Sequence, residues 1–404
     1  MSRNNIANLK SSYRWTKLNF DIVGSWPSSS SNIGQFRAFI NSVLITTLIL
    51  IPRFSALYYI KNYLDGVVFN ASGNLIYIVS IIKMFVIFKN QKVLAKILDD
   101  ILSEWNNSLE NSNYHVVEKY ANISKNISIL SLLISWTVCV MGCLAQRYSN
   151  IEIDDSVERH PRLAEDMFWV SYFPYDIHAT KIIFALHWTL QAYASVVGAT
   201  IYVAFDCYCC FLILHLTGQL TILQIDLRNI HLKYKSKNYN TNNLQSKLKK
   251  IVKRHHELIQ LSVTLEKCFN KVLLLQLLTC CLTFASQGYL MIGKLIRGDM
   301  TFFQTEFAVA YTTYTVVHFY FLCYAGESLI QTSMKIGFAA YEAEWYDLST
   351  NEGKLLMFVT LNSMRSLKIT TGKFAILSYE LFITVIRTSL SYLSVLLAAK
   401  DSKS

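Results

Sequence analysis

The last apolar segment of the chain carries hydroxylated and small side chains in a pattern that could face water. At about 100° per residue of an α-helix, these side chains share one stripe, and bulky aliphatic residues lie on the opposite side. The stripe consists of Thr384, Thr388, Ser391, Val395, Ala398 and Ala399. Small residues allow close helix packing, but several copies of the stripe around one axis could also form a pore that valine closes by dewetting. Periodicity alone leaves both interpretations open.

The remaining polar residues do not form a catalytic pattern. The sequence contains no phosphate-binding loop, no pair of carboxylates within an apolar segment and no plausible Ser-His-Asp set. The nine cysteines lie in or beside the apolar segments, without histidines at the spacing that metal ligation requires. We therefore predict that the protein is not an enzyme and that it holds neither a metal ion nor a cofactor.

The composition is that of a protein that crosses a membrane several times. Of the 404 residues, 52% are hydrophobic and 16% are charged, a balance that soluble proteins of this size rarely show. Seven segments reach the roughly 20 apolar residues that span a bilayer. They are residues 36–59, 67–88, 127–146, 182–216, 272–296, 302–324 and 374–399. We predict an all-α membrane protein with a single seven-span domain over residues 1–404.

The basic residues predict how this domain is oriented. Of the 38 lysines and arginines, 26 lie on the face shared by the N-terminus and the loops 89–126, 217–271 and 326–373, against 10 on the other face. By the positive-inside rule, the N-terminus is cytoplasmic and the C-terminus is extracellular. This distribution accounts for the net charge of +11 without a nucleic-acid partner. Lys83 is then expected to extend its amine to the cytoplasmic surface, and Asn70, in a sequon on the outer side, is a predicted glycosylation site.

Two of the cytoplasmic segments are expected to form anchor helices. Residues 217–271 carry leucines and isoleucines at helical spacing in their second half. Residues 326–373 contain an apolar stretch, "KLLMFVTLNSMRSL", that is too short to span a membrane and should be buried against other helices. We predict that both segments pack together inside the cell, next to the last span.

Several motifs resemble the insect odorant receptor family. They are "YFPYD" before the fourth span, "HFYFLCYAGESLI" leaving the sixth, "AAYEAEWYDLS", and above all "LKITTGKFAILSYELFITVIRTSLSYLSVLL". The resemblance implies an odorant-gated, non-selective cation channel of olfactory sensory neurons, with four subunits around a pore that the last span lines. In the family, the position that matches Val395 forms a hydrophobic gate, and Ser391 and Ala398 match neighbouring pore-facing positions.

Two departures narrow the resemblance to a tuning, ligand-binding subunit. Related gustatory receptors end in a Thr-Tyr and then a Gln-Phe pattern, whereas this chain has Ser391 with Tyr392 and then Ala398 with Ala399. The obligate co-receptor has a longer insert between the fourth and fifth spans, which this chain lacks. The expected partner is therefore that co-receptor, in a heterotetramer at the plasma membrane. A gustatory-like channel is the alternative; a metabotropic seven-span receptor would need the opposite orientation.

The resemblance also indicates where a small volatile ligand would bind. The family pocket lies in the outer half of the bundle, between spans two, three, four and six, and a dry aromatic cavity suits an apolar ligand. On the predicted orientation, the outer halves of these spans offer Tyr77, Ser80, Val138, Met141, Gly142, Trp188, Gln191, Ala192, Ser195, Tyr311 and Tyr314. Tyr311 and Tyr314 lie three residues apart and so share one helix face.

Overall fold

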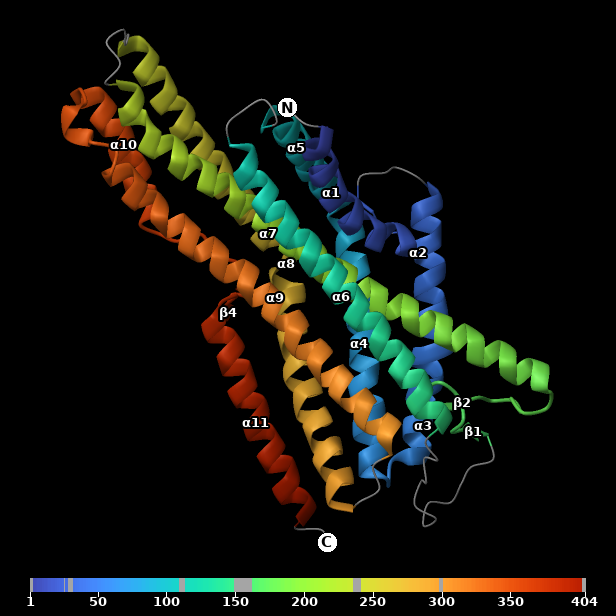
Figure 1. The fold of residues 1–404 in the computed structure, drawn as a ribbon. Coiled ribbons are helices and arrows are strands. Elements are labelled where there is room, and N and C mark those ends of the chain that lie inside the picture. The colour runs from blue at the N-terminus through green and yellow to red at the C-terminus, as the bar shows by residue number, and fades with distance from the viewer. Residues whose placement is uncertain are drawn as a thin grey trace.

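The protein, a computed structural model, is an elongated bundle of helices with two short β-ribbons (Figure 1). The structure describes residues 3–24, 26–27, 32–108, 113–148, 162–234, 241–297 and 301–401. The first half forms α1 (Arg3–Val23), α2 (Asn32–Ile45), the π-helical turn η1 (Thr46–Leu50), α3 (Ile51–Ile60), α4 (Leu64–Lys89), α5 (Gln91–Ser108) and α6 (Tyr114–Tyr148). The second half forms β1 (Leu163–Ala164), β2 (Ser171–Tyr172), α7 (Lys181–Tyr234), α8 (Thr241–Arg297), α9 (Phe302–Tyr341), the 3-10 turn η2 (Trp345–Asp347), α10 (Thr350–Ser363), β3 (Thr370–Thr371), β4 (Ala375–Ile376) and α11 (Tyr379–Asp401).

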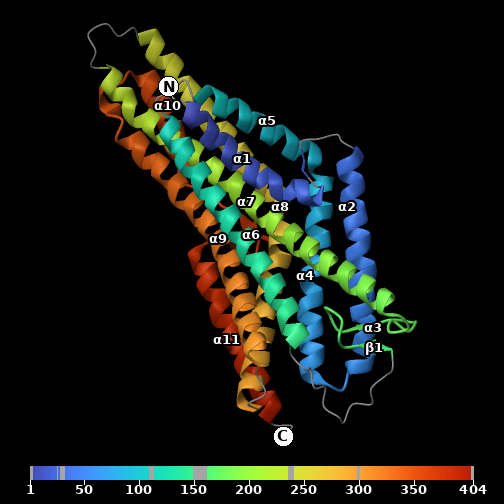
Figure 2. The same cartoon turned by 45° about the vertical axis from the view of Figure 1, so that its right-hand side comes forward.

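Several of these helices are long and apolar enough to cross a membrane, and the prediction of an all-helical membrane protein is confirmed. Among the described residues, five stretches meet this condition: Gly34–Ile60, Leu64–Lys89, Tyr114–Ala145, Lys181–Ile230 and Leu244–Lys294. The other two predicted spans correspond to the first part of α9 and to α11. Figure 2, turned by 45°, shows the same long helices running side by side.

The helices α7 and α8 are much longer than a bilayer requires. They have 54 and 57 residues, so each extends about 80 Å against a hydrocarbon layer of about 30 Å. Their far ends lie beside the end of α9, and α10 packs against both α8 and α9 at that end of the bundle (Figure 1). Segment 217–271 therefore continues α7 and α8 as unbroken helices over most of its length.

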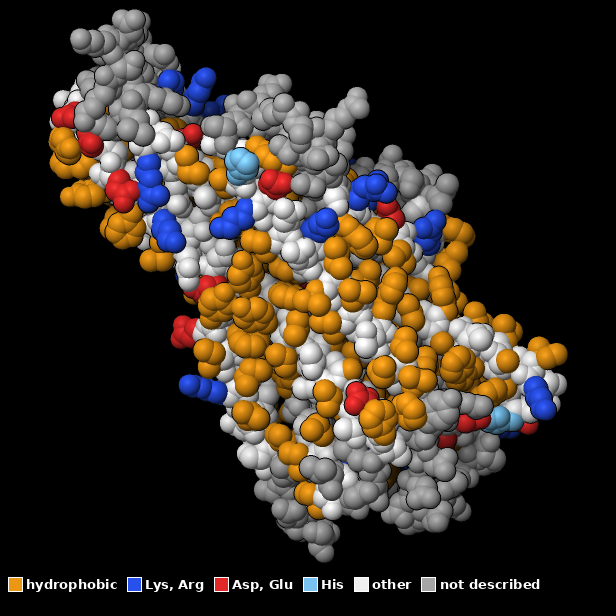
Figure 3. All heavy atoms as spheres, in the orientation of Figure 1, with side chains coloured by type: hydrophobic (Ala, Val, Ile, Leu, Met, Phe, Trp, Pro, Cys, Tyr) orange, Lys and Arg blue, Asp and Glu red, His pale blue; other side chains and the backbone are white. Residues whose placement is uncertain are grey.

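Side chains on the surface divide into two zones along the bundle. On the face shown in Figure 3, hydrophobic side chains form a broad band over the middle of the molecule. Lysines and arginines lie mainly above this band, toward the end that holds α1 and α10 (Figures 1 and 3). The N-terminal helix and the C-terminus lie at opposite ends of the bundle (Figure 1). An apolar band flanked by a basic end is the arrangement that a membrane-embedded bundle needs.

A β-hairpin turns the chain into α11. Gly372 and Lys373 both have positive φ values, 62° and 67°, which suits a tight hairpin turn, and the Phe374 amide closes the turn on the Thr371 carbonyl at 3.1 Å. The Gly372 amide donates to the Asn270 carbonyl of α8 at 2.8 Å. The hairpin is thus fixed to α8, and it sets the direction in which α11 returns along the bundle.

A buried ionic cluster joins α4, α7 and α9. Lys83 is completely buried, and its Nζ lies 2.8 Å from an Asp206 carboxylate oxygen and 3.4 Å from the centroid of the Tyr202 ring. The other Asp206 oxygen lies 3.2 Å from His318 Nδ1. The expectation that Lys83 extends to the surface is therefore wrong, because Asp206 on the neighbouring helix supplies its counter-charge inside the bundle.

Candidate functional site

The helix of the first predicted span is interrupted between α2 and α3, next to the candidate site. The π-helical turn η1 adds one residue to a helical turn, and Pro52 is the second residue of α3, which follows it. Because proline has no amide hydrogen, the Leu48 carbonyl loses its helical donor; the Gln191 side-chain amide of α7 donates to that oxygen at 3.0 Å instead. The extra residue also rotates α3 about its axis. Arg53 thereby faces the interior, where only 1% of it is exposed.

The loop between α6 and α7 folds back over the bundle and supplies an aromatic side chain. Its strands β1 and β2 pair antiparallel, with Ala164 opposite Ser171. The Trp169 amide donates to the Gln191 side-chain oxygen at 3.1 Å. The Trp169 indole nitrogen lies 3.1 Å from the Tyr77 hydroxyl and 3.0 Å from the Ser195 hydroxyl, and it donates to both. Backbone and side-chain contacts together therefore hold the indole against α4 and α7.

Beneath Trp169 lies a cavity of about 60 Å³, which we call the aromatic cavity. Its walls come from α4, α6, α7, α9 and the loop before α7. They are formed by Gly73, Ile76, Tyr77, Ser135, Val138, Cys139, Gly142, Phe168, Trp169, Ser195, Ala199, Phe307, Tyr311 and Tyr314. The rings of Phe307 and Tyr311 stack with centroids 5.8 Å apart. Such walls suit a small, largely apolar molecule.

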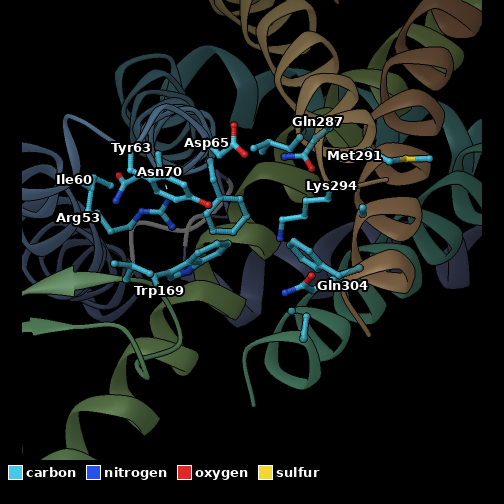
Figure 4. A pocket seen from close by; sticks show the side chains of 18 of the residues that line it. Arg53, Ile60, Tyr63, Asp65, Asn70, Trp169, Gln287, Met291, Lys294 and Gln304 are labelled. Atoms are coloured by element: carbon cyan, nitrogen blue, oxygen red, sulfur yellow. Dashed lines mark hydrogen bonds between the residues drawn. The ribbon is translucent and has the colours of Figure 1, made fainter. Parts of the chain in front are cut away.

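A second cavity of about 130 Å³, the Arg53 cavity, adjoins the first. The two share Gly142, Phe168, Trp169 and Phe307. The Arg53 cavity differs in its polar side chains, which are Arg53, Asp65, Asn70, Gln287, Lys294 and Gln304. Figure 4 shows the Arg53 side chain between Asn70 and Trp169, with Lys294 and Gln304 on the opposite wall.

The structure brings together about half of the residues predicted to contact a ligand. Those on the wall of the aromatic cavity are Tyr77, Val138, Gly142, Ser195, Tyr311 and Tyr314. The wall does not include Ser80, Met141, Trp188, Gln191 or Ala192. Ser80 is fully buried and donates to the Gly198 carbonyl at 3.0 Å, and Gln191 uses its amide to hold η1 and the β1–β2 loop. Trp188 packs beneath that loop.

Sequence reasoning missed the cavity residues that lie outside the four spans expected to form the pocket. Phe168 and Trp169 come from the loop before α7, and Arg53 comes from α3. One signal pointed to the loop: "MFWV" at residues 167–170 is an apolar run inside an otherwise acidic segment. Met167 and Phe168 in this run are buried, as a run of this kind in a polar loop would suggest.

Most of the described side chains of the predicted pore stripe on α11 are exposed. The helix packs on α8 and α9, and its buried side chains are Leu381, Val385 and Ser389. Thr384 and Ser391 are exposed, Thr388 is half-buried, and Val395 is 64% exposed. The side chains of Ala398 and Ala399 lie outside the described residues. The stripe therefore remains available for contacts beyond this chain.

Asn70, the predicted glycosylation site, faces the interior of the bundle. It is 3% exposed, its side-chain oxygen accepts a hydrogen bond from the Asn74 amide at 2.8 Å, and its carbonyl accepts one from Arg53. An N-linked glycan is bulky and lies on the surface. The placement of Asn70 therefore argues against a glycan at this residue.

The long apolar helices, with an aromatic cavity between them, define a multi-pass membrane protein. The comparisons with known proteins identify the family. The family model described as "7tm Odorant receptor" matches residues 65–390, and the chain belongs to this insect odorant receptor family. Its members are odorant-gated ion channels and not enzymes. The predicted family membership and the absence of enzyme activity are thereby confirmed.

Individual relatives match this chain at low sequence identity and over different shares of its length. "Odorant receptor 13a" of Drosophila melanogaster is 23% identical over 95% of this chain and 93% of its own length. The "Odorant receptor coreceptor" of the same species is 27% identical over only 39% of this chain and 32% of its own. The olfactory receptor OR5 of Machilis hrabei, solved in complex with eugenol, superposes with a TM-score of 0.76 at 15% identity, covering 98% of this chain and 100% of that one.

Proposed function

We propose that this chain is the odorant-binding subunit of a heteromeric cation channel in the plasma membrane of olfactory sensory neurons. Seven spans would place the N-terminus in the cytoplasm and the C-terminus outside, with α10 and the far ends of α7 and α8 as the cytoplasmic anchor. The basic end around α1 and α10 supports this orientation (Figure 3). The partner would be the odorant receptor co-receptor in a tetramer.

The aromatic cavity carries this proposal. Tyr77, Tyr311 and Tyr314 converge there from two helices, and Trp169 closes the wall from the loop. A small volatile molecule would be enclosed by aromatic and aliphatic side chains, as apolar ligands usually are. Its binding energy could then favour one arrangement of these helices over another, which is how a ligand shifts a conformational equilibrium.

Currents from cells that express the chain with and without an insect odorant receptor co-receptor test this function. We expect volatile compounds to evoke cation currents only when both subunits reach the surface. An epitope at the C-terminus should be labelled by antibody on intact cells. A complex that reaches the surface but stays silent to a broad volatile panel, or a tag accessible only after permeabilisation, would contradict the proposal.

Replacing Val395 by alanine is expected to raise basal current. In the proposed tetramer, the exposed Val395 side chain of each copy of this chain faces the pore axis, and shortening an apolar side chain at a pore constriction lowers the barrier to wetting. Leu390→Ala is the matched control, because Leu390 is 60% exposed on another side of α11. Basal current measured at equal surface expression should rise for Val395→Ala and stay near wild type for the control. Equal basal currents in the wild type and both variants would contradict the assignment of Val395 to the gate.

A further inference from the structure

Arg53 is a buried cation without a carboxylate partner among the described residues. Only 1% of it is exposed. Its Nη2 donates to the Asn70 carbonyl at 2.8 Å, and its Cζ lies 4.2 Å from the centroid of the Trp169 ring. Within the described part of the chain, no Asp or Glu oxygen lies within 4.0 Å of it, and Nε and Nη1 have no hydrogen-bond partner. The Asn70 carbonyl and the Trp169 ring thus hold the guanidinium in place, while the N–H groups of Nε and Nη1 remain without an acceptor.

This arrangement is costly unless something else completes it. A guanidinium carries five N–H donors and stays charged in proteins. Burying a charge without an opposite charge is unfavourable, and a neighbouring carbonyl and an aromatic face compensate for only part of that cost. Lys83, the other buried cation of the bundle described above, has Asp206 as its counter-charge. Arg53 differs from it in facing a cavity.

The cation lies where the two cavities meet. A Cβ atom added to Gly73 would collide with Arg53 Nη2, so the guanidinium occupies the space that this glycine leaves open. Gly73 lines the aromatic cavity, while Arg53 lines the other one. Trp169, which the guanidinium covers, lines both. A molecule in the aromatic cavity could therefore extend a polar group to Arg53.

Two other charged side chains lie on the described wall of the Arg53 cavity. Among the described residues of this wall, Asp65 is the acidic side chain, and the contacts of Arg53 are instead the Asn70 carbonyl and the Trp169 ring. Lys294, on the opposite wall, adds a second positive charge to the same cavity (Figure 4). On the part of this wall that the structure describes, two basic groups stand against one acidic group, and an excess of positive charge favours a negatively charged head group.

We propose that Arg53 binds the carboxylate of a small organic acid whose apolar body fills the aromatic cavity. The carboxylate takes the place of the missing counter-charge, and the planar guanidinium can hold it through two parallel N–H donors. This proposal rests on the proposed odorant-binding function and adds the chemical class of the ligand. Arg53 thereby selects ligands by their head group, and the aromatic cavity limits the size of the apolar part of the ligand.

A series of compounds with one ring and different head groups tests the ligand class. Benzoic acid, benzaldehyde, benzyl alcohol and toluene are applied to cells that express the chain with the co-receptor. We expect the acid to be the most potent, since a hydrogen bond to a charged group contributes about 10- to 100-fold in affinity. Hexanoic acid, hexanal, hexanol and hexane repeat the comparison for an aliphatic body.

Variants of Arg53 assign the preference to this residue. Arg53→Met should reduce the potency of the acids about 10- to 100-fold and leave the alcohols and hydrocarbons within about threefold. Arg53→Lys keeps the charge but not the planar fork, so it should fall between the two. Arg162→Met is the matched control. Arg162 is an exposed residue directly before β1, in the loop that carries Trp169, and it lines neither cavity.

Folding and binding are checked without relying on gating. Arg53→Met should reach the surface at wild-type level or above, because it removes an uncompensated buried charge. Sodium benzoate should raise the thermal midpoint of the purified wild-type assembly more than that of Arg53→Met. An acid that is no more potent than its alcohol, or an Arg53→Met effect equal for all head groups, overturns the proposal while the odorant-gated function stands. Silence toward every volatile, with both subunits at the surface, contradicts the function itself.

Discussion

Asp206→Asn should lower the free energy of unfolding by about 3–5 kcal/mol, the usual cost of removing one partner from a buried ion pair. The substitution keeps the size of the side chain but removes the counter-charge of the Lys83 ammonium. Lys83 is a residue of α4 and is 0% exposed, so water cannot replace the lost partner. It also removes the charge that faces His318 on α9 at 3.2 Å. Three helices lose a common contact, so surface expression and the thermal midpoint in detergent should both fall.

An exposed ion pair supplies the control for this prediction. Arg228 Nε lies 2.6 Å from a Glu342 oxygen, but both side chains are about half exposed. Glu342→Gln should therefore cost about 1 kcal/mol or less. Replacing both Lys83 and Asp206 by leucine should restore most of the loss, because an apolar pair often substitutes for a buried ion pair. Normal stability of Asp206→Asn would show that the cluster does not hold these helices together.

Ala199→Leu should abolish most of the response to volatile ligands. Ala199 lines the aromatic cavity from α7, and the larger side chain would occupy a large part of a space of about 60 Å³. Because a single methylene group changes ligand discrimination by 10- to 200-fold, we expect potency to fall about 100-fold or more. Folding should be little affected, since the new atoms enter existing space and do not displace packed neighbours.

The same helix carries a matched control for this substitution. Ala192 lies seven residues before Ala199, about two turns along one face of α7. Both alanines are half-buried, but Ala192 lines neither cavity. Ala192→Leu should change the potency of the same volatile panel by less than about threefold at equal surface expression. Equal losses in the two variants would place the ligand nearer the start of α7, where the family resemblance put Ala192.

The sequence predicts the helices well because length and hydrophobicity are local properties. The spacing of Tyr311 and Tyr314 likewise indicated a shared face on α9, and both line the cavity. The position of Lys83 could not be predicted in the same way, because its partner Asp206 is 123 residues away. Trp169 belongs to a loop, and a loop that folds back over the bundle leaves no periodic pattern. Arg53 lies within the predicted span 36–59, and its inward orientation depends on the π-helical turn η1, which a periodic pattern does not reveal.

The extra residue in η1 has a consequence for how such receptors diverge. The Ile51 amide donates to the Thr46 carbonyl, five residues earlier, so the phase of α3 depends on one inserted position. Deleting that codon would restore regular winding and turn Arg53 by about 100°, away from the binding space, without altering any residue that lines it. A lineage could therefore gain or lose acid detection through a three-nucleotide indel, a change that comparisons of pocket residues alone would overlook.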